Sequence, residues 1–288
     1  MRRGRAIYWS RELLALGFVV EPRIMKLGER LARRFLARSV ADPALRARLT
    51  PSYTMGCKRI LPTNSYLPAL QRENVDLVTD GIAEVRAGSI VSKDGTERAV
   101  DVIVLATGFE AAEHVAPFEV RGRGGRELDE VWRDGASAYL GTTVSGFPNM
   151  FLLVGPNTGL GHSSMVFMIE SQVAYVLDAV KKMRALGLKA VDVKADTQAR
   201  YNERLQERLK GTVWSSGCMS WYLTRSGRNT TIWPGFTFEF RLRTRRFDAG
   251  SYDQVKLSKS DGAAQGTGVA RVAHAPEMTT SSRSFTLT

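Results

Sequence analysis

The sequence predicts an α/β fold, and three features of the chain carry that prediction. Residues 150–154 are all apolar, as in a short buried strand, and the run breaks at Gly155-Pro156. A glycine-rich loop follows and leads into an amphipathic helical pattern over residues 163–186. A second apolar run, residues 102–105, ends in a turn of small residues. Because both runs are apolar on each face, they are typical of strands inside a parallel sheet.

The first 50 residues predict a basic helical segment. Apolar residues recur there at helical spacing and fall on one face: Ile24, Leu27, Leu31, Phe35 and Leu36. A second short helix is expected to begin at Pro43, with Asp42 as its N-cap. These residues are too few to form a core of their own, so we expect residues 1–50 to lie over another part of the molecule.

Residues 51–105 predict short strands joined by tight turns. The expected strands are residues 75–78, 82–85, 89–91 and 102–105. Lys93-Asp94-Gly95 is the expected hairpin turn, because glycine accepts the backbone conformation that such turns require.

Two further regions complete the predicted organisation. Residues 106–248 contain the strand–loop–helix unit, a second amphipathic helix over residues 196–210 and an aromatic-rich segment over residues 214–247. Residues 249–288 are rich in Ser, Thr, Gly and Ala and carry few large apolar side chains. We therefore expect a disordered tail there.

Composition excludes some classes of function. The net charge of +12 is concentrated at the N-terminus and around residues 241–246, without the interleaved aromatic residues of nucleic-acid-binding proteins, so no nucleic-acid partner is expected. No apolar run is long enough to span a bilayer. The two cysteines, Cys57 and Cys218, lie far apart in sequence and are expected to be reduced and unpaired. These features together predict a cytoplasmic protein.

The glycine loop after residue 154 predicts a cofactor site. Free backbone N–H groups and the positive end of the helix dipole meet at such a loop, and both favour an anionic or electron-rich ligand. His162 lies in this loop, but a loop histidine more often forms a capping hydrogen bond than acts as a base.

Two other kinds of segment bear on the site. Lys58 and Arg59 follow Gly56-Cys57, and adjacent side chains point in different directions, so the pair could serve two anions at once; a pair of surface charges is the alternative. Residues 214–222 and 228–235 are dense in Trp and small polar residues, which suit a polar ligand or simple packing.

These segments, in this order, resemble the class B flavin-dependent monooxygenases, and most of all the Baeyer–Villiger type. The resemblance covers about residues 51–247. The matching stretches are GCKRILPTNSYLPALQRENVDLVTDGI, DVIVLATGF, FPNMFLLVGPNTGLGHSSMVFMIESQ, WSSGCMSWYL and GRNTTIWPG. The resemblance implies FAD and NADPH as cofactors. It also implies insertion of one oxygen atom from dioxygen into a ketone or aldehyde by way of a flavin peroxide.

The resemblance also assigns roles to residues. Arg59 matches the arginine that stabilises the anionic flavin peroxide, and Lys58 matches the lysine that recognises the 2′-phosphate of NADP. Trp221 matches a tryptophan that contacts the nicotinamide nucleotide. Residues 106–109, among them Thr107 and Gly108, match the hinge between the two nucleotide domains. The loop against the flavin ring is matched by Gly155, Pro156, Asn157, Ser164 and Met165.

The family pattern implies two Rossmann-like dinucleotide-binding domains. Residues 51–105 match the C-terminal part of the NADP domain, and residues 106–248 match the C-terminal part of the FAD domain. The G-x-G-x-x-G loops of the family are absent, and Gly159-x-Gly161-x-x-Ser164 is only a near-match within the flavin-ring loop. We therefore expect a partial fold that lacks the N-terminal FAD βαβ unit and that binds FAD poorly by itself.

Two alternatives stay open from the sequence. One is a monooxygenase that oxygenates nitrogen or sulfur, in which no carbonyl adduct needs stabilising. The other is a non-catalytic truncated remnant. The expected partners are dioxygen and a small carbonyl or heteroatom substrate, and nothing in the sequence specifies the substrate or the oligomeric state.

Overall fold

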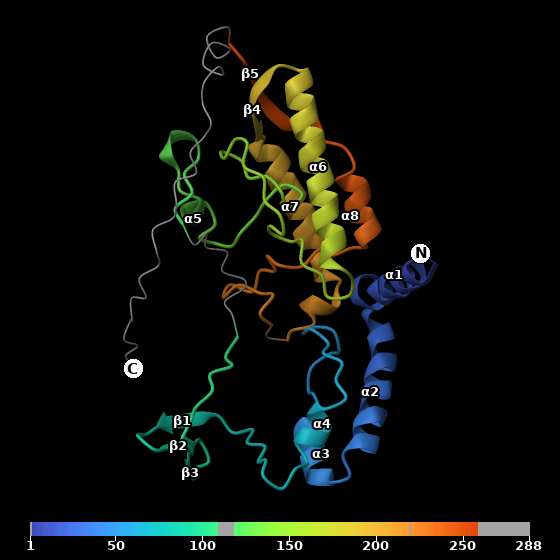
Figure 1. Ribbon diagram of the computed structural model, residues 1–288, viewed down its shortest axis with the longest axis vertical. Coiled ribbons are helices and arrows are strands. Elements are labelled where there is room, and N and C mark those ends of the chain that lie inside the picture. The colour runs from blue at the N-terminus through green and yellow to red at the C-terminus, as the bar shows by residue number, and fades with distance from the viewer. Residues whose placement is uncertain (1, 109–117, 219, 259–288) are drawn as a thin grey trace.

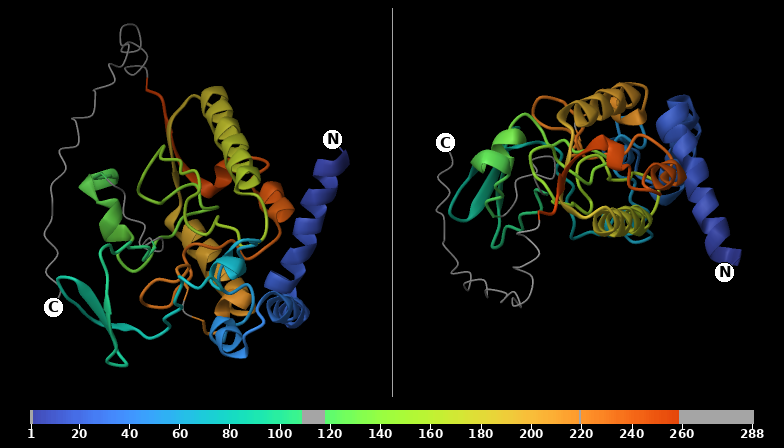
Figure 2. Two further views of the ribbon diagram at one scale, coloured as in Figure 1. Left: turned by 60° about the horizontal axis from the view of Figure 1, so that its bottom comes forward. Right: turned by 90° about the horizontal axis from the view of Figure 1, so that it is seen from above.

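The computed structural model describes residues 2–108, 118–218 and 220–258, and its helices and strands form two groups (Figure 1). The first group is a body in which long helices pack beside a two-stranded sheet. The second is a separate three-stranded sheet, whereas the N-terminal helices pack against the body through residues such as Phe18. Both Figure 1 and Figure 2 show this small sheet standing apart from the long helices of the body.

The N-terminal segment is helical, as the sequence predicts. It contains α1 (Arg2–Ala15), a π-helical turn (Leu16–Val20), a 3₁₀ turn (Pro22–Ile24), α2 (Met25–Ser39) and α3 (Pro43–Leu49). The Asp42 carboxylate accepts hydrogen bonds from the N–H groups of Ala44 and Leu45, which confirms the predicted N-cap. Of the predicted apolar face, Leu36 is buried, whereas Ile24, Leu27, Leu31 and Phe35 are exposed.

The small sheet has three antiparallel strands in the order β1–β2–β3. After α4 (Tyr66–Ala69) come β1 (Ile82–Val85), β2 (Ser89–Ser92) and β3 (Glu97–Ala99). Two of the predicted strands and the turn at Lys93-Asp94-Gly95 are confirmed. Gly95 has φ +83°, and the Asp94 carboxylate accepts a hydrogen bond from the Thr96 N–H.

Two predicted strands of this region are absent. Residues 75–78 and 102–105 have no regular structure, and the side chains of Val102, Val104 and Leu105 are 76%, 84% and 81% exposed. An apolar run supplies a tendency to be buried, but a strand also needs a neighbouring backbone that pairs with its N–H and C=O groups. No such neighbour lies beside residues 102–105 within the described residues.

Within the described residues, the body is built on four α-helices and a two-stranded sheet. Its elements are a 3₁₀ turn (Arg123–Gly125), α5 (Leu128–Val131), α6 (Met165–Ala185), β4 (Leu188–Val193), α7 (Ala195–Lys210), a 3₁₀ turn (Val213–Ser215), α8 (Thr237–Arg243), a 3₁₀ turn (Ala249–Ser251) and β5 (Tyr252–Lys256). The helices predicted over 163–186 and 196–210 are confirmed as α6 and α7. α6 packs against both α8 and β4 (Figure 1).

The prediction of a disordered tail over residues 249–288 is wrong for its first residues, which form the last 3₁₀ turn and β5. β5 pairs antiparallel with β4, with Tyr252 opposite Val193, and the Tyr252 hydroxyl bonds to Thr143 and Tyr175 in the buried core. The backbone pairing with β4 and the buried Tyr252 side chain together fix this segment. The rest of the predicted tail, residues 259–288, lies outside the described residues.

The predicted strand at residues 150–154 is also absent, and a side-chain bond from α6 holds this segment instead. Gln172 is fully buried; its Oε1 accepts from the Val154 N–H, and its Nε2 donates to Gly141 O and Thr142 Oγ1. Both sheets named here are antiparallel, so the parallel sheet expected from the apolar runs is not found among the described residues.

Two clusters of buried side chains stabilise the body. The larger joins α6, α7 and α8 to the N-terminal helices through residues such as Phe18, Met168, Trp214, Trp233 and Phe240. The second lies between α6 and the β4–β5 sheet, where Tyr175, Phe247 and Tyr252 pack together. The candidate site lies on the first cluster.

Candidate functional site

The loop over residues 155–164 is bonded to the aromatic-rich segment after residue 228. Asn157 has φ +55°, and its side-chain Nδ2 donates to Asn229 O at 2.9 Å and to Ile232 O at 3.0 Å. The Gly159 N–H donates to Thr231 O, and the Trp233 N–H donates to Gly159 O, both at 2.8 Å. The buried amide of Asn157 is thus committed to shaping the loop.

Glycine is required at Gly155 because two parts of the backbone meet there. A Cβ atom on Gly155 would lie 2.3 Å from the carbonyl oxygen of Gly141, which is closer than real Cβ contacts occur. Gly159 has a similar constraint, since its Cβ would lie 2.7 Å from Thr231 O. Pro156 is buried between these two positions. The loop therefore has a fixed path across the core.

Arg59 reaches this loop from about a hundred residues earlier in the chain. Its Nη2 donates to Leu160 O at 3.4 Å, although the side chain itself is exposed. Burial raises the pKa of the Tyr222 hydroxyl, and the nearby Arg59 guanidinium partly opposes that shift. Arg59 therefore lies where the loop and the segment around Tyr222 meet.

Lys58 points elsewhere. Its ammonium group lies over the Tyr53 ring, 4.8 Å from the ring centre, in a cation–π contact. The two adjacent cations thus point in different directions, as the sequence predicts.

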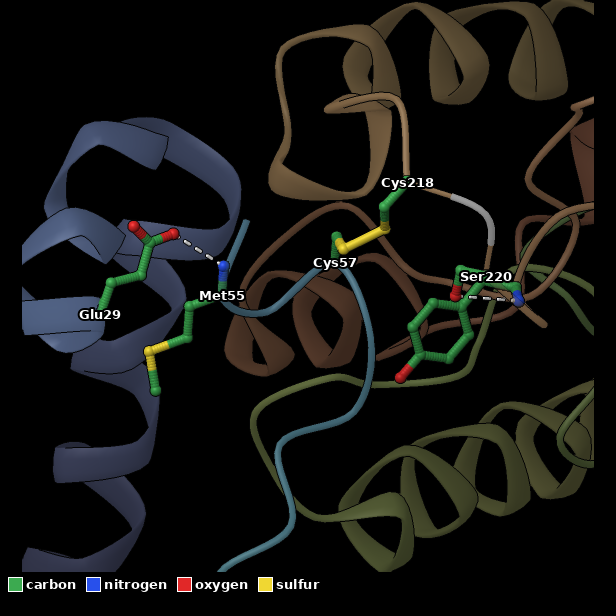
Figure 3. Close-up of a disulfide and its surroundings, with 6 residues drawn as sticks. Glu29, Met55, Cys57, Cys218 and Ser220 are labelled. Carbon is green, nitrogen blue, oxygen red and sulfur yellow. Dashed lines mark hydrogen bonds between the residues drawn. A yellow bond between two sulfur atoms is a disulfide. The ribbon is translucent and has the colours of Figure 1, made fainter. Parts of the chain in front are cut away.

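The two cysteines are joined, which corrects the prediction of unpaired thiols. Cys57 and Cys218 form a disulfide across 161 residues of sequence (Figure 3). Sequence separation is a poor guide here, because the fold brings the loop that carries Lys58 and Arg59 against the segment that carries Trp221. Glu29 of α2 accepts a hydrogen bond from the Met55 N–H at 2.9 Å and supports the same loop from the other side (Figure 3).

Trp221 is exposed at the edge of this assembly. Its side chain is 43% exposed, and its ring lies 4.4 Å from that of Tyr222. At the other edge, Ser164 is the N-cap residue of α6, and its side chain makes no capping hydrogen bond, which leaves the first N–H groups of the helix open. Met165 packs against the larger core cluster directly beyond it.

His162 is buried in the loop and does not serve as an exposed base. Within the part of the chain that the structure describes, neither of its ring nitrogens has a hydrogen-bond partner. Burial lowers the pKa of His162, and the negative charge of Glu12 only partly opposes this, so the imidazole is kept neutral. Its ring lies against that of Phe18, 5.9 Å between centres.

Three comparisons with known proteins bear on this arrangement. No family model matches the chain. A Baeyer–Villiger monooxygenase of Pseudomonas aeruginosa is 53% identical over 248 residues, which cover 85% of this chain and 47% of that protein. By sequence, this chain belongs with the Baeyer–Villiger-type flavin monooxygenases.

Solved structures of such monooxygenases resemble the chain in fold as well. An oxidized steroid monooxygenase bound to NADP matches with a TM-score of 0.74 and 28% identity, covering 89% of this chain and 52% of that one. OTEMO in complex with FAD and NADP matches with a TM-score of 0.74 and 25% identity, covering 82% and 46%. The chain spans about half the length of the relatives that it matches, so the fold is that of part of such a flavoprotein.

One segment of the flavin-monooxygenase pattern is not brought to the site. Thr107 and Gly108 are exposed, and among the described residues neither forms a hydrogen bond to the loop over residues 155–164. Gly108 has φ +89°, and a Cβ atom there would meet nothing of the described chain within 4 Å. No other described backbone approaches this turn closely, and the approach to a cofactor stays a prediction. Phe109, the end of the predicted hinge, lies outside the described residues.

Two hollows of the described chain lie elsewhere. A cavity of about 480 Å³ lies beside α7 and is lined by residues such as Ser137, Gln198, Asn202 and Arg228. Another, of about 630 Å³, lies between α3 and the segment around Leu77. Neither contains a predicted site residue. Within the described residues, no helix is long and apolar enough to cross a membrane.

Sequence reasoning missed two residues that organise the site. Gln172 was part of a predicted helix only, yet it holds residues 141–154 by three buried hydrogen bonds. Asn149 has φ +59° and bonds by its side chain to Val191 N and Lys189 O, which fixes the start of the same segment. A polar residue at a position of α6 that faces the core was the available signal for Gln172.

Proposed function

We propose that this chain provides the flavin-ring side of the active site of an FAD- and NADPH-dependent monooxygenase that inserts one oxygen atom from dioxygen into a ketone or an aldehyde. The observation that carries the proposal is the hydrogen bond from Arg59 Nη2 to Leu160 O of the glycine loop, between residues 101 positions apart in the sequence. Two segments that resemble separate parts of one flavoprotein site are thus joined in one place.

The residues present fit the flavin. The loop from Gly155 to Ser164 is rigid, because Asn157 and Gly159 bond it to residues 229–233, and it ends at the uncapped N-terminus of α6. Open N–H groups at a helix N-terminus favour an electron-rich edge such as that of a flavin ring. Buried Trp214 Nε1 and Thr231 Oγ1 have no partner among the described residues, so polar atoms without partners lie close to this loop.

The nicotinamide nucleotide fits the opposite edge. Lys58 supplies an exposed cation for a phosphate, and its present contact with the Tyr53 ring is a weak one that a phosphate can replace. Trp221 offers an exposed aromatic face 4.4 Å from the Tyr222 ring. The disulfide between Cys57 and Cys218 holds these two residues on neighbouring segments.

The proposed oxygenation requires one main contribution from the residues of this chain. The bound flavin, once reduced by NADPH, supplies the activation of dioxygen. Arg59 supplies a permanent positive charge where negative charge develops on oxygen, and a preorganised donor of this kind is worth most where water is excluded. Arginine suits this task better than lysine because it stays charged and holds its donors in a rigid fork.

Oxygenation of nitrogen or sulfur is the alternative reaction. Such substrates form no carbonyl adduct, and so they need no cation to stabilise one. The placement of Arg59 at the glycine loop therefore favours the carbonyl reaction. A non-catalytic remnant is the third possibility, and it predicts no activity under any arrangement of the chain.

A chimera tests the proposed reaction. Residues 51–247 would replace the matching segment of the Pseudomonas aeruginosa relative, and a cyclic ketone and a sulfide would be assayed side by side. Arg59→Ala in this chimera is expected to lower kcat for the ketone by about 10²–10³-fold and that for the sulfide much less. Arg59→Lys should recover part of the loss, because it restores the charge without the fork.

One control variant and two contradicting outcomes test the role of Arg59. Arg72→Ala removes an exposed cation of the same stretch that lies outside the site and should leave both rates unchanged. Full ketone activity in Arg59→Ala would remove Arg59 from its proposed role, and an inactive chimera that folds and binds FAD would favour the remnant. The 288-residue chain alone is expected to purify without stoichiometric flavin absorbance.

A further inference from the structure

We propose that the Cys57–Cys218 disulfide is a redox-controlled clamp on the candidate site. In its oxidised form it holds the segment of Lys58 and Arg59 beside the segment of Trp221, with Arg59 at the glycine loop; in its reduced form it releases the Lys58–Arg59 segment. The inference concerns regulation and rests on the proposed function for its consequence, although the clamp itself can be tested without any cofactor.

The position of the disulfide links the two edges of the site. Cys57 immediately precedes the Lys58–Arg59 pair, and Cys218 lies three residues before Trp221 (Figure 3). These two segments come from parts of the chain 161 residues apart. A covalent bond at this place therefore fixes the distance between the residue expected to bind phosphate and the one expected to contact the nicotinamide nucleotide.

Few other bonds hold the loop that carries the cations. Among the described residues, the hydrogen bonds from residues 51–60 to other elements are Met55 N–H to Glu29 and the 3.4 Å contact of Arg59 with Leu160 O, and the Arg59 guanidinium also interacts with the Tyr222 hydroxyl. No helix or strand is present between α3 and α4, so the backbone of this loop has no ladder of hydrogen bonds. Without the sulfur–sulfur bond, the part of the loop after Cys57 would depend on these Arg59 contacts.

The body of the molecule does not depend on the disulfide in this way. α6, α7 and α8 and the β4–β5 sheet are held by many other buried side chains and by the Gln172 hydrogen bonds. Cys57 is itself a buried member of the larger cluster, with Cys218 packed against it, but the two loops that the disulfide joins lie outside the long helices. Its loss should therefore loosen the site and leave the long helices in place.

The two sulfur atoms differ in access, which sets the course of reduction. Cys57 is fully buried, whereas Cys218 is only partly buried. A thiolate of a small dithiol therefore attacks Cys218 Sγ, the sulfur–sulfur bond breaks, and Cys57 leaves as a thiolate that takes up a proton. The second thiol of the dithiol then displaces Cys218, so that the dithiol is oxidised to its cyclic disulfide and both cysteines are reduced.

Hydrogen exchange on the 288-residue chain tests the clamp. The protein is oxidised with glutathione disulfide, its Cys57–Cys218 cross-link is verified by peptide mapping without reductant, and amide exchange is compared before and after dithiothreitol. Reduction is expected to speed exchange by about tenfold at the hydrogen-bonded amides of Met55, Cys57, Ser215 and Ser216 and to leave α6 and α7 unchanged. Reoxidation should restore the slow rates.

The double variant Cys57→Ser/Cys218→Ser is the matched control. It should exchange like the reduced protein and should not respond to dithiothreitol. Free thiols at both cysteines after oxidation would overturn the proposal, as would equal exchange in the two redox forms. A dithiothreitol response that persists in the double variant would overturn it too, because the reductant would then act elsewhere.

Titration with NADP⁺ alone, followed by tryptophan fluorescence, separates the clamp from the proposed function. Weaker binding to the reduced form supports redox control of the site, and equal binding to both forms overturns that control. If NADP⁺ binds neither form, the nucleotide role proposed for this chain alone fails, and the exchange data still decide the clamp.

Discussion

The valines of β4 and those of the apolar run at residues 102–105 differ sharply in burial, and the contrast explains how this fold is built. In β4, Val191 and Val193 are 2% and 1% exposed, whereas Val102 and Val104 are 76% and 84% exposed. β4 has the backbone of β5 on one side and α6 packed over it. Residues 102–105 have neither. Apolar composition thus decides burial only where a second element arrives to cover it.

The largest expected loss of stability comes from truncating a buried aromatic side chain in the core of the body. Phe240 of α8 is fully buried and packs edge-to-face on Trp233, with 5.3 Å between ring centres. We expect Phe240→Ala to lower the free energy of unfolding by about 3–5 kcal/mol, because it leaves a cavity that the neighbours cannot fill. Urea unfolding followed by circular dichroism measures this.

Phe238 provides the matched control on the same helix. Its side chain is 38% exposed, so Phe238→Ala should cost about 1 kcal/mol or less. Equal losses for the two variants would mean that the exposed face of α8 is covered in solution, which would weaken the contrast between buried and exposed regions.

A smaller effect is expected from the buried histidine of the loop. Burial lowers the pKa of His162 in the folded state, so the unfolded chain binds more protons at mildly acidic pH. The free energy of unfolding should therefore fall as the pH drops below about 6.5, the ordinary pKa of histidine. Wild-type protein and His162→Gln are compared by urea unfolding at about pH 7.5 and about pH 5.5.

The sign of the difference is the test of this prediction. His162→Gln removes the titrating group, so it should lose less stability than the wild type between the two pH values. A variant that loses as much or more would show that His162 is solvated in solution, and that the loop is more open than its hydrogen bonds to residues 229–233 indicate.

The smallest effect is expected in the exposed apolar run. Val104→Ser should change the free energy of unfolding by no more than about 0.5 kcal/mol, because its side chain is already in contact with solvent. It should also reduce binding of a hydrophobic dye such as ANS. Val193→Ser, the same change at a buried strand position, should cost several-fold more. A large loss in Val104→Ser would instead show that this run is covered in solution.

Much of the candidate site could be predicted from local sequence, and the parts that failed share one cause. The glycine loop, the α6 helix behind it and the divergent directions of Lys58 and Arg59 follow from residue types and short spacings. The predicted strands at residues 102–105 and 150–154 did not form, because a strand depends on a partner that its own sequence does not encode.

The cysteine pair also shows that local sequence patterns do not predict long-range contacts. Separation in sequence predicted two free thiols, yet the loops of Cys57 and Cys218 meet in the fold. The disulfide, the placement of Gln172 under residues 141–154 and the separation of Thr107 from the glycine loop are all long-range facts. Periodicity and composition report only on neighbours within a few residues.

The sequence by itself determined the helical N-terminal segment, α6 and α7, the Asp42 cap, the glycine loop and the kinship with flavin monooxygenases. Each of these depends on residues close together in the chain or on the order of whole motifs. Only the tertiary structure decided which apolar runs are buried, which cations meet the glycine loop and which cysteines pair. Those outcomes depend on the approach of segments that are more than a hundred residues apart, and that approach is driven by burial of the whole surface rather than by any one motif.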